Sequence, residues 1–186
     1  MKLVHLDLET TGVDVKLHGV CQISGIIEID NVIKEKFDFL VKPRLNVIYD
    51  PGALKVNKRT EEEMQTFEDM ESVYKKLITI LSKYINKFDK TDKAFIVAYN
   101  SKFDVDFLRR WFLDCNDKYF GSWFWSNSID IMALASEMLK HVRHEMINFK
   151  LKTVAEAFEI PINEEEVHDG MYDVEISKQI YDKMVN

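Results

Sequence analysis

The sequence predicts a single α/β domain, residues 1–186, in which a mixed β-sheet is flanked by helices. Two observations lead to this fold class. Three strand-like segments come first in the chain, at about 2–8, 20–30 and 33–41. After them, short apolar runs alternate with segments of helical periodicity, which is typical of strands connected by helices. A chain of 186 residues is long enough for one domain with a sizeable core.

The N-terminal strands are expected to be antiparallel neighbours. The second and third are rich in β-branched and aromatic residues, and they predict a hairpin that turns at Asp30 and Asn31. Residues 47–60 follow as a loop or a short helix. A further, buried strand is predicted at 94–99, where the chain is again apolar.

The clearest helical periodicity runs from about residue 70 to residue 88. A second helix is expected from about 104 to 114, directly after the buried strand. Apolar residues form one stripe along the first of these helices: Val73, Leu77, Ile80, Leu81 and Ile85.

The C-terminal third is expected to be mainly helical. Residues 128–130 form a short strand end that leads into a helix to about residue 141, with Asp130 as its N-cap. Two more helices are expected at roughly 150–158 and 171–184. The aromatic run Tyr119–Trp125 could stack on nucleic-acid bases. Packing in a core or a partner interface is favoured, because aromatic residues are more often used in that way.

Composition narrows the class of protein. Hydrophobic residues at 46% and charged residues at 31% are ordinary for a soluble globular domain, and no apolar stretch is long enough to span a bilayer. The first ten residues do not form a signal peptide, because their apolar part is short and carries an acid. Cys21 and Cys115 lack metal-type spacing, which favours a reduced, intracellular protein. The net charge of −7 argues against a broad basic surface that grips duplex DNA.

Acidic side chains recur where predicted strands end and helices begin. Asp7 and Glu9 form a D-x-E on the first strand, and residues two apart on a strand point to the same face. Asp104 follows the buried strand, and Asp173 opens the last helix. Four acids brought together repel one another and raise each other's pKa. Two divalent cations would remove this conflict, and phosphodiester hydrolysis uses such ions to activate water and to stabilise the leaving oxygen.

His168 lies five positions before Asp173, after the acidic stretch 164–166. A lone histidine in an acidic loop is commonly just solvated. A loop histidine and a first-turn aspartate can, however, reach one metal cluster from the same side. A neutral imidazole near pH 7 is suited to act as the general base for an attacking water.

Three motifs carry a resemblance to a known family: LDLETTG at Leu6–Gly12, YNSKFDVDFL at Tyr99–Leu108 and HDGMYD at His168–Asp173. From Lys2 to about Tyr181 the chain resembles the DEDDh (DnaQ-like) 3′–5′ exonucleases, which include the proofreading subunit of bacterial replicative polymerases, RNase T and oligoribonuclease. The resemblance implies a ribonuclease H-like fold and two Mg²⁺ or Mn²⁺ ions, with His168 as the catalytic base. It implies these metal ligands, which are also catalytic: Asp7, Glu9, Asp104 and Asp173.

The family pattern also decides between Asp104 and Asp106. In the second motif of the family the metal-binding acid comes directly after a phenylalanine. Asp104 follows Phe103 and is therefore assigned to the metal site, and Asp106 is expected to be a solvated helix residue. A sister class has a tyrosine four residues before the final aspartate. This chain has Asp169 there, so the histidine class fits. Tyr99 stands where the family usually has histidine, at a position that is not a metal ligand.

Contacts to substrate are implied by the same resemblance. The segment Ala53–Asn57 corresponds to one that lines the nucleotide pocket, although the family often has histidine where Asn57 stands. Core packing is the favoured alternative for Leu54 and Val56. The strand end is expected to meet the 3′-terminal nucleotide through the backbone near Leu8, Thr10, Thr11 and Gly12.

Two more substrate-binding candidates lie in the second motif. Asn100 is equally well explained as a turn residue or as a substrate contact, and Phe103 precedes the assigned acid.

The expected function is a metal-dependent 3′–5′ exonuclease that releases mononucleotides from single-stranded 3′ ends. DNA is the first choice of substrate, and RNA or short oligoribonucleotides are the second. The chain has no room for a polymerase domain, so any proofreading would serve a separate polymerase. A non-catalytic binding module of the same fold is the main rival. It predicts the loss of a ligand acid, and none is missing. A structural scaffold would explain the aromatic run but not five converging polar residues.

Overall fold

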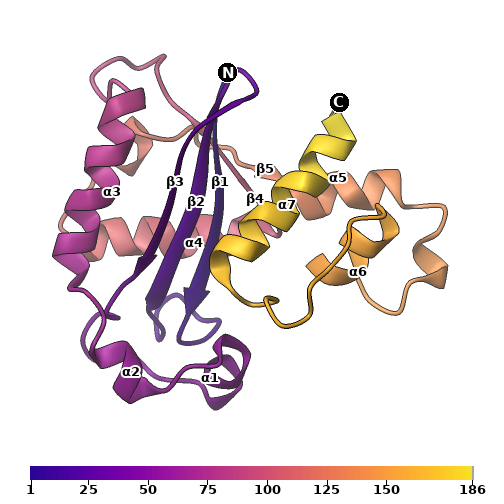
Figure 1. The fold of residues 1–186 in the computed structure, drawn as a ribbon. Helices are drawn as coiled ribbons and strands as arrows, with labels where there is room; N and C mark the ends of the chain where they lie inside the picture. Colours follow the sequence, from indigo (N-terminus) through magenta and orange to yellow (C-terminus); the bar gives the residue numbers. More distant parts are fainter. Residues whose placement is uncertain (186) are drawn as a thin grey trace.

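A computed structural model describes residues 1–185, and in this part of the chain five strands form one sheet in the order β3-β2-β1-β4-β5 (Figure 1). The first three strands pair in an antiparallel manner, and β4 and β5 continue the sheet in parallel with β1. The predicted mixed sheet and the hairpin at Asp30–Asn31 are therefore confirmed. The strands are β1 Lys2–Thr10, β2 Val20–Ile29, β3 Val32–Leu40, β4 Phe95–Ala98 and β5 Ile129–Asp130.

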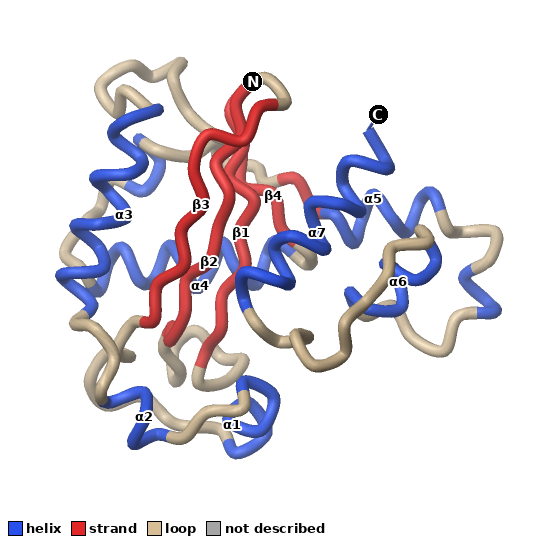
Figure 2. Tube along the Cα trace, viewed as in Figure 1, coloured by secondary structure: helices blue, strands red, loops and turns tan. Residues whose placement is uncertain are grey.

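Helices cover both faces of the sheet (Figures 1 and 2). One group packs on the larger hydrophobic cluster, and a C-terminal group packs on a second cluster on the other face. Within residues 1–185, none of the helices has the length and apolarity needed to cross a membrane. The helices are α1 Pro51–Asn57, α2 Glu61–Gln65, α3 Met70–Tyr84, α4 Ser101–Asp114, α5 Ile131–Met138, α6 Leu151–Ala157 and α7 Gly170–Val185, with 3₁₀ turns at Phe120–Ser122 and Arg143–Glu145.

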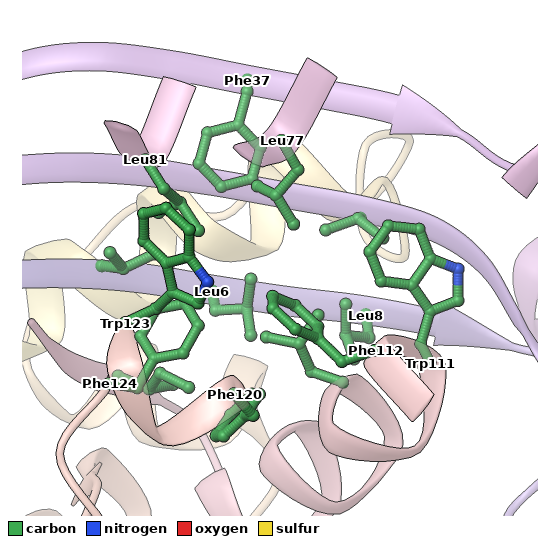
Figure 3. Packing of buried hydrophobic residues seen from close by; sticks show 14 of the residues in the cluster. Leu6, Leu8, Phe37, Leu77, Leu81, Trp111, Phe112, Phe120, Trp123 and Phe124 are labelled. Carbon is green, nitrogen blue, oxygen red and sulfur yellow. The ribbon is translucent and has the colours of Figure 1, made fainter. Parts of the chain in front are cut away.

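The larger cluster lies between the sheet, α3 and α4, and aromatic residues fill it (Figure 3). Phe120, Trp123 and Phe124 are buried there, so the core interpretation of the aromatic run is confirmed for them. Tyr119 is 73% exposed and does not take part. The predicted stripe of α3 faces the same cluster through Val73, Leu77, Leu81 and the following Ile85.

Two boundaries differ from the sequence prediction, and one short helix was not predicted. The helix expected to reach residue 88 ends at Tyr84, because turns held by Asp89 and Asp92 compete with the helix beyond it. The second helix begins at Ser101, so Asp104 lies in its first turn. The short helix α2 was not predicted, although its capping box of Thr60 and Glu63 is a recognisable start signal.

Candidate active site

The acidic pair of β1 faces the C-terminal helix. Side chains alternate along the strand, so Leu8 points into the larger core while His5, Asp7 and Glu9 share the opposite face. On that face His5 packs edge-to-face against Tyr181 of α7, with ring centroids 5.5 Å apart. Asp7 and Glu9 follow in the direction of the start of α7, where β1 ends (Figure 1).

Asp173, in the first turn of α7, completes a group of three carboxylates. One oxygen each from Asp7, Glu9 and Asp173 lies within 4.8 Å of the others. The close approach of α7 to the sheet depends on Gly170, where a Cβ atom would meet the Ser24 hydroxyl at 2.5 Å. All three carboxylate residues are half-buried. Oxygens at this spacing suit a shared hard cation.

Asp104 lies beside the C-terminal part of β1, which is not paired with β4. The ladder between β1 and β4 runs from Leu3 to His5, and α4 then begins beside the remainder of β1. The Leu8 backbone N–H donates to Asp104 Oδ1 at 3.1 Å. This hydrogen bond does not use Oδ2, the other oxygen of the buried carboxylate. Asp106, two positions later, pairs with Lys102, in agreement with its predicted role on the helix surface.

The pKa of each of the four carboxyl groups is raised by burial and by the charge of a neighbouring acid. Burial and then the charge of Asp173 raise the pKa of Asp7 to about 8. Burial and the charge of Asp7 raise the pKa of Glu9 to about 9, and the same two causes raise the pKa of Asp104 well above its ordinary value. The pKa of Asp173 rises to about 6, mainly through burial. The nearby cations therefore do not offset the burial and repulsion of the carboxylates, and these oxygen donors are the kind that Mg²⁺ and Mn²⁺ prefer.

His168 lies in the loop that leads into α7. Its backbone has a φ of 70°, in the left-handed region, and its backbone N–H lowers the pKa of Asp173. Burial, followed by the charges of Lys58 and Lys150, lowers the pKa of the imidazole below its ordinary value. The ring is therefore neutral near pH 7, which is the state that a general base needs.

The helix α1 lies beyond the end of β1 (Figure 1). The side chain that it buries is Asn57, whose amide donates to the Thr10 carbonyl at 2.9 Å. Val56 is 45% exposed and Leu54 is half-buried, so the favoured expectation that they pack in the core is wrong. A seven-residue helix beyond the ends of the strands has little surface to bury. Leu54 instead lines an open groove of about 470 Å³ that also includes Arg59.

The turn after β1 is held by side-chain hydrogen bonds. Thr10, which still belongs to β1, donates its hydroxyl to the Gly12 carbonyl at 2.7 Å, and Thr11 donates to the Ile48 carbonyl at 2.8 Å. A Cβ atom at Gly12 would lie 2.3 Å from the His18 ring, so only glycine fits this turn. These contacts place the turn at the end of the strand that carries Asp7 and Glu9.

Two candidates from the second motif have structural roles. Asn100 is exposed, with a φ of 60°, directly before α4, which supports its interpretation as a turn residue. Phe103 is half-buried and packs on Phe107, with ring centroids 4.8 Å apart. Substrate contact remains a prediction for both.

Three charged residues near the carboxylates were not among the sequence candidates. The charge of Asp169 raises the pKa of both Asp7 and Glu9, whereas the charge of Arg59 lowers the pKa of Glu9. The Lys58 ammonium contacts the loop before His168. Asp169 lies inside the third motif, and the two cations directly follow the segment assigned to the nucleotide pocket, so both signals were present in the sequence.

Comparison with known proteins agrees with this arrangement. The sequence model of a family described as "Exonuclease" (RNase_T) matches residues 4–181. The chain belongs to this exonuclease family. Its sequence relatives include DNA polymerase III PolC-type from Thermotoga petrophila, 25% identical over 182 residues, and the protein of that name from Caldanaerobacter subterraneus, 24% identical over 184 residues. These alignments cover 98% and 99% of this chain but only 12% of each relative.

Solved structures of Escherichia coli exonuclease I share the fold of this exonuclease family member. A complex with a dT13 oligonucleotide superposes with a TM-score of 0.76 at 22% identity, and a zinc-bound complex with single-stranded DNA has a TM-score of 0.75 at 24% identity. Each alignment covers 99% of this chain and 40% of the exonuclease I chain. The ribonuclease H-like fold is therefore confirmed.

Proposed function

We propose that this protein is a metal-dependent 3′–5′ exonuclease that releases mononucleotides from single-stranded 3′ ends, with DNA preferred. The observation that carries the proposal is the meeting of Asp7, Glu9 and Asp173 within 4.8 Å in a chain of the exonuclease family. Asp104 lies beside this group, and His168 lies on the loop that enters it. The likeness to exonuclease I bound to a dT13 oligonucleotide supports single-stranded DNA as substrate.

Asp7, Glu9, Asp104 and Asp173 would hold two Mg²⁺ or Mn²⁺ ions. When bound, such ions activate water and stabilise charge on the leaving oxygen. The neutral His168 imidazole accepts the proton of the attacking water. The lowered pKa of His168 keeps this ring unprotonated at neutral pH, so the base is available without a preceding deprotonation step.

The groove beside α1 is the proposed site of the 3′-terminal nucleotide. The partly exposed Leu54 and Val56 provide apolar surface for a base or sugar, and Asn57 ties this helix to Thr10 at the end of β1. The backbone at Leu8, Thr11 and Gly12 is the other proposed contact to this nucleotide, as the family resemblance implies. A nucleotide held there would place its 5′ phosphate toward Asp7 and Glu9. Asn100 and Phe103 flank Asp104 from α4 and are proposed contacts on the other side.

Three aspects of the biological setting belong to the same proposal. The relatives named DNA polymerase III PolC-type support a role in proofreading for a polymerase. RNA or short oligoribonucleotides are the second substrate class, because the carboxylate site acts on a phosphodiester that both nucleic acids share. The free thiols of Cys21 and Cys115 support work in a reducing, intracellular compartment.

The deciding experiment is gel-resolved digestion of end-labelled single-stranded DNA and RNA. We expect 5′-labelled DNA to shorten in single-nucleotide steps with Mg²⁺ or Mn²⁺, and EDTA or Asp7→Asn to stop the reaction. Asp106→Asn is the control for loss of an acid, because Asp106 lies outside the carboxylate group and pairs with Lys102 at the surface. Cleavage of circular single-stranded DNA as fast as linear DNA would identify an endonuclease and refute the proposal.

A further inference from the structure

Lys58 joins two parts of the site that are far apart in the sequence. It is the C-cap residue of α1, at the edge of the groove that Leu54 lines. Its ammonium group donates to the carbonyl oxygens of Glu165 at 3.1 Å and Val167 at 3.3 Å. The first of these acceptors lies 107 positions further along the chain, in the loop that leads to His168.

The backbone of Lys58 has a conformation that disfavours a lysine. Its φ is 54°, in the left-handed region where helices usually end on glycine because a side chain is strained there. A glycine at this position would relieve the strain but would lose both hydrogen bonds to the loop. The side chain of Lys58 therefore has a use that the helix cap alone does not explain.

The loop 163–169 has different anchors along its length. Its first part is held by the Asn163 backbone N–H, which donates to the Tyr172 hydroxyl at 2.7 Å, and by the ion pair of Glu164 with Lys152. In the described part of the chain, the hydrogen bonds that reach residues 165–168 from outside this loop and α7 come from Lys58.

The negative charge of the loop and of the nearby carboxylates makes the contact of Lys58 with the loop more important. The loop carries three consecutive glutamates at 164–166, and it leads into α7, where Asp173 belongs to the group of three carboxylates. Like charges repel the loop from the site, and a cation between them reduces that repulsion. The charge of Lys58 acts on both sides, since it lowers the pKa of Asp173 as well as that of His168.

We propose that Lys58 is a positioning residue, which holds the loop 163–169 against α1 and so keeps the His168 imidazole in place beside Asp173. This inference rests on the proposed function, in which His168 is the base. Because α1 also lines the proposed nucleotide groove, the same helix sets the position of the base and of the substrate. Lys58 acts through the loop and forms no part of the reacting groups.

The test compares Lys58→Gly and Lys58→Met with the natural protein. The substrates are the p-nitrophenyl ester of thymidine 5′-phosphate, which has no upstream strand, and a labelled oligothymidylate. We expect kcat on both substrates to fall about 10–100-fold, because a misplacement of about 1 Å can cost about 10²-fold. KM for the small ester should not change, and Lys58→Arg should recover part of the rate. Lys75→Met is the control, since it removes an exposed charge from α3, a helix that contributes no residue to the candidate site.

Two further measurements separate positioning from a loss of structure. Lys58→Gly should melt no lower than the natural protein, because it relieves the strained φ, and it should keep the Mn²⁺-induced rise in melting temperature. Its loop 163–169 should be cut faster by proteases. The double variant Lys58→Gly/His168→Ala should be no slower than His168→Ala alone, because residues that act as one unit are not additive.

The outcomes distinguish the failure of this inference from the failure of the proposed function. Normal kcat in the Lys58 variants, with a slow His168→Ala, would overturn the positioning role and leave the proposed function intact. A rise in KM confined to the oligothymidylate would also overturn it, because Lys58 would then grip strand phosphates. If the natural protein hydrolyses neither substrate, the proposed function fails and the inference fails with it.

Discussion

Replacing Asp7 with asparagine should make the metal-free protein more stable while it destroys the proposed site. The Asp7 carboxyl has a folded-state pKa of about 8, compared with an ordinary value of 3.8, because it is buried beside Asp173. Between these two values the unfolded chain releases a proton that the folded chain keeps. The free energy of unfolding therefore falls as pH rises from about 4 to about 8. Asparagine has no proton to release, so its advantage grows over the same range.

The size of the effect follows from the pKa difference. A pH of 7 is about 3 units above the pKa of this carboxyl in the unfolded chain. At about 1.4 kcal/mol per unit, the loss in free energy of unfolding is at most roughly 4 kcal/mol. Asp7 is half-buried, and solvent screening reduces this to about 1–3 kcal/mol. For a chain of this length the melting temperature should rise by about 2–12 °C. The asparagine amide can donate to a neighbouring carboxylate, as the protonated acid does.

Thermal melts followed by circular dichroism in EDTA at pH 5.0 and 7.5 measure this effect. We expect Asp7→Asn to exceed the natural protein by more at the higher pH, and to show no further rise with Mn²⁺. Asp106→Asn is the control, since it loses an exposed ion pair worth about 0–1 kcal/mol and should show no such trend. An Asp7→Asn variant that melts at or below the natural protein at pH 7.5, or whose difference does not depend on pH, would refute the electrostatic reasoning.

Three other predictions follow from the same structure. His168→Ala should lower kcat by about 10²–10⁴-fold and abolish the rise in rate with pH through the imidazole pKa. Mn²⁺ should still raise the melting temperature of this variant. A near-normal rate with an unchanged pH profile would contradict the assignment of His168 as the base. Mn²⁺ should stabilise the natural protein but not Asp104→Ala in thermal scans, and equal shifts would remove Asp104 from the ligand set. Gly170→Ala should lower the free energy of unfolding by about 1–3 kcal/mol in urea melts, because its Cβ would lie 2.5 Å from the Ser24 hydroxyl, and Ser24→Gly in the same chain should restore part of the loss.

Much of the candidate site was predictable because it depends on spacing within single elements. Asp7 and Glu9 share a face because strand side chains alternate, and Asp104 lies in the first turn of a helix that begins after a buried strand. Val56 shows where this reasoning ends. Its residue type favours a core position, but α1 lies at the edge of the sheet and leaves it 45% exposed. Burial depends on which elements cover a residue, and the local pattern does not contain that information.

Local geometry, read from the amino-acid order, was enough to predict the fold class, the hairpin at Asp30–Asn31 and the shared face of Asp7 and Glu9. The tertiary structure alone decided how close these groups come. It showed that three carboxylates lie within 4.8 Å, where the charge of Asp173 raises the pKa of Asp7 and of Glu9. It also showed that Lys58 reaches Glu165 and Val167 across more than half of the chain. Periodicity constrains residues a few positions apart, whereas a contact between distant elements depends on how their packed surfaces and backbone turns fit together.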